Sequence, residues 1–223
     1  MIWALTGFMG CGKTSIGRLA ASLSAGLEFI DLDEEIERRE GRSIPDIFSA
    51  DGESVFRSIE RRTLAELLLA AGRSPFGSSL RSPHPPFGTV PPLSNVGPPE
   101  NENFLGYNRG CYVPQGERQL QSSVLISLGG GTLTDEESRK LVRENCKCIY
   151  LRASLETLAE NLREAGTEGR PLLKLAPGES LEDRIRTLMA QRSAIYEKAA
   201  DIILDIDGLD YDDAANHLAH LIQ

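Results

Sequence analysis

Residues 7–14 read GFMGCGKT, and this stretch decides the fold of the chain. It satisfies the pattern G-x-x-x-x-G-K-[ST], follows an apolar run at 2–6 and leads into residues 13–25, whose apolar positions repeat at helical spacing. This context predicts a strand, a phosphate-binding loop and a helix, because glycines let backbone N–H groups turn around phosphate oxygens and the helix N-terminus adds partial positive charge. A chance glycine turn is the alternative, and the flanking pattern argues against it. The residues expected to contact ATP here are Gly10, Cys11, Gly12, Lys13, Thr14 and Ser15.

Lys13 and Thr14 carry the specific chemistry of this loop. The Lys13 ammonium is expected to reach the β and γ phosphates, and the Thr14 hydroxyl to bind a magnesium ion.

Two aspartates, Asp31 and Asp33, end a strand predicted over 28–33. Because side chains alternate along a strand, both carboxylates are expected on one face and Leu32 on the other. Ligands of open α/β sheets gather at the carboxyl ends of the strands. One acid can therefore face a hydrated Mg²⁺, while the other accepts or orients the proton of an acceptor hydroxyl. Two aspartates before a helix can also serve only as caps, but the neighbouring phosphate loop favours the functional interpretation.

Further along the chain, short apolar runs alternate with helical patterns. Fully apolar strands are typical of a parallel sheet buried on both faces, and parallel neighbours need crossover connections. The sequence therefore predicts an α/β fold with a doubly wound, five-stranded parallel sheet and helices on both faces. Strands are expected at 2–6, 28–33, 124–127, 148–151 and 202–206, and helices at 13–25, 34–40, 43–71 with a longer part after Gly52, 135–144, 155–165 and 181–199.

Residues 74–121 follow neither period. They hold nine of the chain's 12 prolines. A structureless link of this length is far longer than the connections usual inside a compact domain, so we expect one domain over 1–223 with an inserted loop or disordered segment at 74–121. A tolerated surface insertion, a coding artefact, a functional lid and a partner-binding segment all remain open.

A glycine segment and four arginines complete the candidate site. Gly129, Gly130 and Gly131 follow the predicted strand at 124–127, where they would expose backbone amides to a ligand, although a plain flexible turn is also possible. A phosphate donor and an anionic acceptor both need positive charge in an acidic protein. The alternative for each arginine is a solvated ion pair, which is the more common role of a single arginine on a helix. The candidates are Arg57, Arg163, Arg192 and Arg170, the last in a glycine-flanked segment that can close as a lid.

Composition excludes several classes of function. The formal net charge is -9 and the pI about 5.0, so we expect neither a nucleic-acid nor a membrane partner. No apolar run approaches the roughly 18 residues of a membrane span, and the first residues lack the pattern of a signal peptide. The four cysteines form no CxxC pair, which favours reduced thiols and a cytoplasmic location.

Taken together, these motifs resemble the shikimate kinase family of P-loop folds over nearly everything outside 74–121. The stretches that carry the resemblance are GFMGCGKT (7–14), DLD (31–33), GRSIPDIFSADGESVFRSIE (41–60), SLGGGT (127–132), GRPLL (169–173) and QRSAIY (191–196). The resemblance implies an ATP-dependent kinase that phosphorylates the 3-hydroxyl of shikimate in aromatic amino-acid biosynthesis, with Mg²⁺ as cofactor.

The resemblance also implies roles for single residues. On the acceptor side, Asp33 would bind ring hydroxyls and act as the base, while Arg57 and Arg192 clamp the carboxylate and Gly130 with its neighbours offers backbone amides. On the nucleotide side, Asp31 would act on magnesium through water. Arg170 would be the lid arginine on the phosphates, and Arg163 would lie against adenine. Lys13, Arg170 and Asp33 form the expected catalytic set.

Two other functions stay open at this point. A kinase for another small acid such as gluconate would keep the phosphate loop and change the acceptor clamp. A non-catalytic nucleotide-binding module would be expected to lack Lys13, Asp33 or Arg170, and the chain has all three. We expect a monomer.

Overall fold

The computed structural model describes residues 1–72, 123–166 and 170–223. The predicted insertion at 74–121 and the glycine-flanked residues before Arg170 lie outside the described residues.

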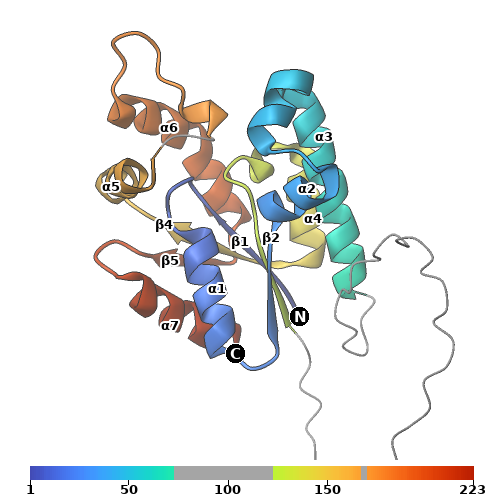
Figure 1. The fold of residues 1–223 in the computed structure, drawn as a ribbon. Helices are drawn as coiled ribbons and strands as arrows, with labels where there is room; N and C mark the ends of the chain where they lie inside the picture. The colour runs from blue at the N-terminus through green and yellow to red at the C-terminus, as the bar shows by residue number, and fades with distance from the viewer. Residues whose placement is uncertain (73–122, 167–169) are drawn as a thin grey trace, which may run out of the picture. The chain divides into compact units, whose positions relative to one another are not determined.

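One five-stranded parallel sheet forms the centre of the fold, as predicted (Figure 1). The strands stand in the order β2-β3-β1-β4-β5, with β1 in the middle. In register, Leu5 of β1 lies beside Ser127 of β3 and Ile149 of β4. The middle strand is buried because helices cover both faces of the sheet. The strands are β1 (Ile2–Gly7), β2 (Leu27–Asp31), β3 (Ser123–Ser127), β4 (Lys147–Arg152) and β5 (Ile202–Asp205).

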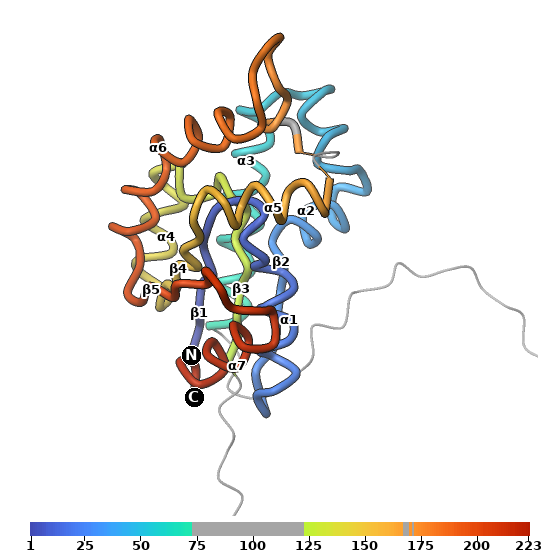
Figure 2. The backbone as a smooth tube through the Cα atoms, turned by 90° about the vertical axis from the view of Figure 1, so that its left-hand side faces the viewer, coloured from blue at the N-terminus to red at the C-terminus, as the bar shows by residue number. Residues whose placement is uncertain are grey.

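The helices form a layer on each side of the sheet (Figures 1 and 2). Helices α1 and α7 pack together on one face, whereas α3, α4 and α6 cover the other. This arrangement confirms the doubly wound fold. No helix in the described part of the chain is long and apolar enough to cross a membrane. The helices are α1 (Lys13–Leu23), α2 (Leu32–Glu40), α3 (Ile44–Gly72), α4 (Glu136–Asn145), α5 (Leu155–Ala165), α6 (Leu181–Ala199) and α7 (Tyr211–Ile222), with short 3-10 turns η1 (Thr132–Thr134) and η2 (Pro171–Leu173).

The boundary between β2 and α2 differs from the prediction. The strand was expected to continue to Asp33, but it ends at Asp31, and Leu32 already begins α2. The physical reason is a cap: the Asp31 carboxylate accepts hydrogen bonds from the N–H groups of Asp33 and Glu34, at 3.0 and 3.3 Å. Asp33 therefore projects from the first turn of a helix, and strand alternation does not set its direction.

Helix α7 was not predicted at all. Its N-cap, Asp210, accepts a hydrogen bond from the Asp213 N–H at 2.8 Å. Ala214, Leu218 and Ile222 then repeat every four residues and pack against α1. The helix places Tyr211 beside Gly12 of the phosphate loop.

Candidate active site

The carboxyl ends of β1, β2 and β3 meet at one edge of the sheet, where two adjoining pockets lie. Strand β1 has β3 on one side and β4 on the other, so the strands that follow β1 are added first on one side of it and then on the other. Open α/β sheets bind ligands at such a point. The nucleotide-side pocket is built around the phosphate loop. The acceptor-side pocket lies between α2, α3 and the glycine segment that follows β3. We use these two names below.

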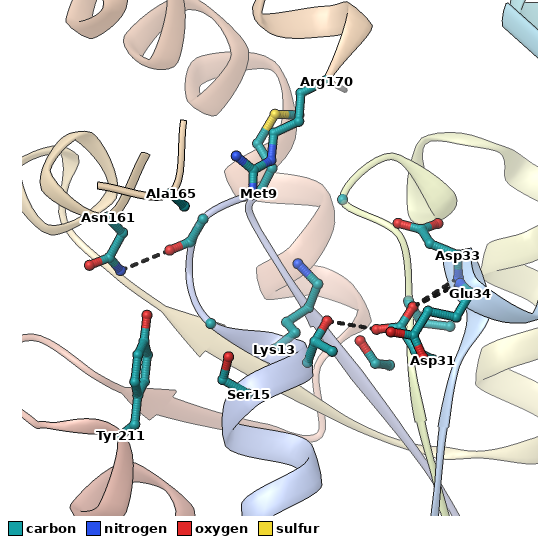
Figure 3. Close-up of a pocket in the computed structure, with 16 residues that line it drawn as sticks. Met9, Lys13, Ser15, Asp31, Asp33, Glu34, Asn161, Ala165, Arg170 and Tyr211 are labelled. Carbon is teal, nitrogen blue, oxygen red and sulfur yellow. Dashed lines mark hydrogen bonds between the residues drawn. The ribbon is translucent and has the colours of Figure 1, made fainter. Parts of the chain in front are cut away.

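Figure 3 shows how the nucleotide-side pocket is arranged. Lys13 lies in the middle, with Asp31 and Asp33 on one side and Asn161 and Tyr211 on the other. The lining also includes Gly10, Gly12, Thr14, Ser15, Ala165 and Arg170.

The phosphate loop depends on glycine at two points. Gly10 and Gly12 have φ angles of 85° and 81°, in the left-handed region that other residues avoid. A side chain on Gly12 would lie 2.8 Å from Cε1 of Tyr211. The Lys13 ammonium donates to the carbonyl oxygens of Gly7 and Phe8 at 3.0 and 3.1 Å, so it is held over the loop.

Thr14 and Asp31 form the candidate magnesium site. The Thr14 hydroxyl donates to Asp31 Oδ2 at 2.6 Å, which places two oxygen ligands side by side next to the loop. Oxygen donors are what Mg²⁺ prefers. In the described residues, no cluster of three or more His, Cys, Asp or Glu side chains is suited to a metal. A cation at Thr14 and Asp31 would therefore complete its shell with phosphate oxygens and water, and the two residues fit that mode of binding.

Asp33 is the most perturbed acid of the site. Burial raises the pKa of its carboxyl to about 7, and the negative charges of Asp31 and Glu60 act in the same direction. Lys13 and Arg57 lower the pKa but do not offset these effects. A carboxyl group that titrates near neutral pH is well matched to accepting a proton from a hydroxyl.

The acceptor-side pocket combines an apolar wall with a positive charge. Phe48 and Phe56 face each other with ring centroids 4.7 Å apart, and Ile44 lies beside them in the lining. The Arg57 guanidinium lies over the Phe56 ring, 5.2 Å from its centroid. Such a pocket suits a small ring that carries an anionic group.

The buried carboxylate of Glu60 connects Arg57 of this pocket to Thr132. Its side chain is 1% exposed, and its carboxylate accepts from Arg57 Nη1 at 2.7 Å and from the Thr132 hydroxyl at 2.6 Å. Arg57 also pairs with Glu53 at 3.2 Å. A buried carboxylate needs such partners, and here they fix the direction of the guanidinium. Sequence reasoning did not single out Glu60, because a glutamate on a helix carries no motif of its own.

The glycine segment lies between α3 and α6. Arg57 approaches Gly131 so closely that a Cβ there would lie 2.3 Å from Arg57 Nη2. From the other side, Arg192 Nη1 donates to the Gly130 carbonyl at 3.2 Å. The two arginines predicted to clamp a carboxylate therefore reach neighbouring glycines. Arg192 is 6% exposed and, within the described part of the chain, is not among the residues that line either pocket.

The two pockets share part of their lining. Arg170, predicted as the lid arginine, borders both and donates to the Gly166 carbonyl. Its segment continues into Leu173, which is buried in the core. The residues common to both pockets are Met9, Asp33, Gly130 and Arg170. A group bound on the phosphate loop and a group bound beside Arg57 would thus meet at Asp33 and Arg170.

Two residues that were predicted to contact ATP do not, within the described part of the chain, line the nucleotide-side pocket. Arg163 pairs with Glu182 of α6 at the surface, and among the described residues it is not part of the pocket lining. Cys11 is fully buried, its N–H donates to the Phe8 carbonyl at 3.2 Å, and within the described residues it is not part of the pocket lining. Both roles stay predictions.

Sequence reasoning did not single out Asn161 and Tyr211, which line the nucleotide-side pocket. The Asn161 amide donates to the Gly10 carbonyl at 2.8 Å, and Tyr211 stands against Gly12 with 49% of its surface exposed. The apolar spacing after Asp210 was the available signal for Tyr211. Nothing local marks Asn161, because its contact lies 151 residues away in the sequence.

Comparison with known proteins identifies the family of the chain. The family model described as shikimate kinase matches residues 9–73 and 117–223. A shikimate kinase of Dictyoglomus turgidum is 31% identical over 211 residues, covering 94% of this chain and 90% of the relative. One of Chlorobaculum tepidum is 35% identical over 208 residues, covering 91% and 80%.

Solved structures give the same result. Shikimate kinase from Acinetobacter baumannii in complex with shikimate superposes with a TM-score of 0.68 at 27% identity, covering 99% of this chain and 92% of that one. Shikimate kinase from Bacteroides thetaiotaomicron superposes with a TM-score of 0.67 at 24% identity, covering 100% and 98%, and supports the fold. On the strength of the family match and these relatives, the chain belongs to the shikimate kinase family.

Proposed function

We propose that this protein transfers the γ-phosphoryl group of ATP to the 3-hydroxyl of shikimate. The observation that carries the proposal is the junction of the two pockets: Asp33 and Arg170 border both the phosphate loop and the pocket that holds Arg57. A donor phosphate and an acceptor hydroxyl bound in these pockets are brought together at those two side chains. Family membership supplies the identity of the acceptor.

On the nucleotide side, backbone N–H groups of the loop and the Lys13 ammonium bind the phosphates. Thr14 and Asp31 hold a divalent cation, which we propose is Mg²⁺; when bound, it supplies positive charge to the phosphate oxygens. Tyr211 and Asn161 lie beyond the loop, on the side away from the acceptor, and we propose them as the wall and edge of the nucleobase site.

On the acceptor side, Arg57 and the amides of the glycine segment bind the shikimate carboxylate, and Arg192 joins them. Phe56 and Phe48 pack against the ring. This orientation presents the hydroxyl to Asp33, whose pKa of about 7 lets it take up the proton as the O–P bond forms. Arg170 neutralises charge on the transferred group, and little further covalent chemistry is required of the protein.

The test is a coupled ADP-release assay with ATP and magnesium, run with shikimate, with gluconate and without acceptor. We expect release only with shikimate. Asp33→Asn should reduce the rate by about 100-fold or more, within the range of general-base contributions. Glu144→Gln, which changes an exposed glutamate of α4, is the matched control and should behave as the wild type. Release with gluconate, or nucleotide binding without transfer to either acid, contradicts the proposal.

We also infer a cytoplasmic monomer. Within the described residues, Cys11, Cys146 and Cys148 form no disulfide with one another, which fits a reducing compartment. Size-exclusion chromatography with light scattering tests the monomer: a mass near 24.4 kDa supports it, and a dimer mass contradicts it.

A further inference from the structure

The Gly130 carbonyl oxygen accepts hydrogen bonds from two side chains of α6. The Tyr196 hydroxyl is one donor, and Arg192 Nη1, at 3.2 Å, is the other. The two residues are four apart on the helix and so lie on the same face. Only Arg192 has a role in the function proposed above.

Tyr196 is built as a fixed donor. Its side chain is 1% exposed, and its ring packs against Tyr150 with centroids 5.3 Å apart, so packing restricts the ring. Burial raises the pKa of its hydroxyl to about 12, and the group therefore keeps its proton under all working conditions. Arg192 differs, because a guanidinium forms a stronger, charge-assisted pair with a carboxylate than with a neutral carbonyl.

The direction of this carbonyl sets the direction of an amide in the acceptor-side pocket. The described residues contain no cis peptide, so the Gly131 N–H points opposite to the Gly130 carbonyl, away from α6. On that side Gly131 lines the pocket and lies against the Arg57 guanidinium. Glycines offer little resistance to rotation of the peptide plane, and hence the plane needs an anchor.

We propose that Tyr196 is a positioning residue for the acceptor carboxylate: it anchors the Gly130 carbonyl so that the Gly131 N–H faces the ligand beside Arg57. The same anchor frees Arg192 to leave the carbonyl and bind the carboxylate. Without Tyr196, this departure would leave a partly buried carbonyl without either of its side-chain donors, which is unfavourable. The inference rests on the proposed function, since it assumes an anionic acceptor such as shikimate.

The test compares Tyr196→Phe with Tyr150→Phe. Both remove one phenol hydroxyl from the same pair of contacting rings, but within the described residues only that of Tyr196 contacts the glycine segment. We expect Tyr196→Phe to raise the KM for shikimate by about tenfold, the loss of one hydrogen bond, with the KM for ATP unchanged. Tyr150→Phe should leave both constants unchanged.

A second measurement uses the wild-type protein and so does not depend on the folding of a variant. In ¹H–¹⁵N NMR spectra, the Gly131 amide proton should shift downfield when shikimate is added and should not respond to shikimate methyl ester, which lacks the anionic charge. No shift with shikimate, or an equal rise of both KM values in Tyr196→Phe, overturns the role of Tyr196. If the wild type releases no ADP with shikimate, the proposed function itself fails, and the inference falls with it.

Discussion

Replacing Asp33 by asparagine should make the ligand-free protein more stable while removing its activity. The pKa of the Asp33 carboxyl rises from 3.8 to about 7 on folding, because the site buries the group beside Asp31 and Glu60. A carboxyl whose pKa is raised on folding weakens the fold when it ionises. The penalty is absent below the unfolded pKa, grows as pH rises from about 4 to about 7, and stays constant above that.

The magnitude follows from about 1.4 kcal/mol for each pKa unit. A shift to about 7 gives a penalty of about 4 kcal/mol at pH 8 and about 2 kcal/mol at pH 5. We therefore expect the stability gain of Asp33→Asn to be larger at pH 8 than at pH 5 by about 2 kcal/mol.

Urea unfolding at the two pH values, without ATP or magnesium, measures this difference. Glu144→Gln removes an exposed carboxylate and serves as the control, with no comparable pH dependence expected. An increase in the free energy of unfolding of Asp33→Asn that is equal at pH 5 and pH 8, or a decrease at pH 8, would refute the reasoning that the site destabilises the ionised carboxylate.

Three further predictions concern the walls of the two pockets. Tyr211→Ala should weaken ATP binding by about 5- to 100-fold, the range for one stacked base, and leave the binding of inorganic tripolyphosphate unchanged. Calorimetry with both ligands measures this. Equal weakening of the two would show that Tyr211 only supports the phosphate loop. Glu60→Gln should raise the KM for shikimate by about tenfold, since Arg57 loses a charged partner, and move the acidic limb of the pH–rate profile downward, as Asp33 loses a negative neighbour. An acidic limb at the same pH as in the wild type would show that Glu60 does not affect the pKa of Asp33. Gly129→Ala puts a Cβ 2.8 Å from Asp33 Oδ1 and should displace this carboxylate. We therefore expect kcat to fall by about 100-fold while ATP binding is retained. A kcat equal to that of the wild type would mean that the position of Asp33 does not limit the rate.

The succession of strands and helices along the chain, apart from α7, was accessible from the sequence because it depends on local periodicity. The phosphate loop, the apolar strands and the helix closed by Gly41, with its φ of 65°, all follow from short-range chemistry. The end of β2 was misplaced for an equally local reason. Apolar alternation continues through Leu32, and only the cap made by the Asp31 side chain shows that the helix has already begun.

The candidate site was partly accessible. Asp33, Arg57 and the glycine segment were predicted, and the structure gathers them in one pocket. Glu60 and Tyr196 could not be singled out, because their importance lies in contacts 72 and 66 residues away in the sequence. Such contacts exist only once α3 and α6 pack on the same face of the sheet.

The central claim is that a phosphoryl group passes from ATP to one hydroxyl of shikimate between Asp33 and Arg170. The most direct measurement is to incubate the protein with ATP, magnesium and shikimate and to follow the products by ³¹P NMR with ¹H–³¹P correlation. We expect a phosphomonoester signal coupled to the proton at C3 of shikimate, formed in equal amount with ADP. Inorganic phosphate as the only new signal, or a coupling to a proton at another ring carbon, would contradict it.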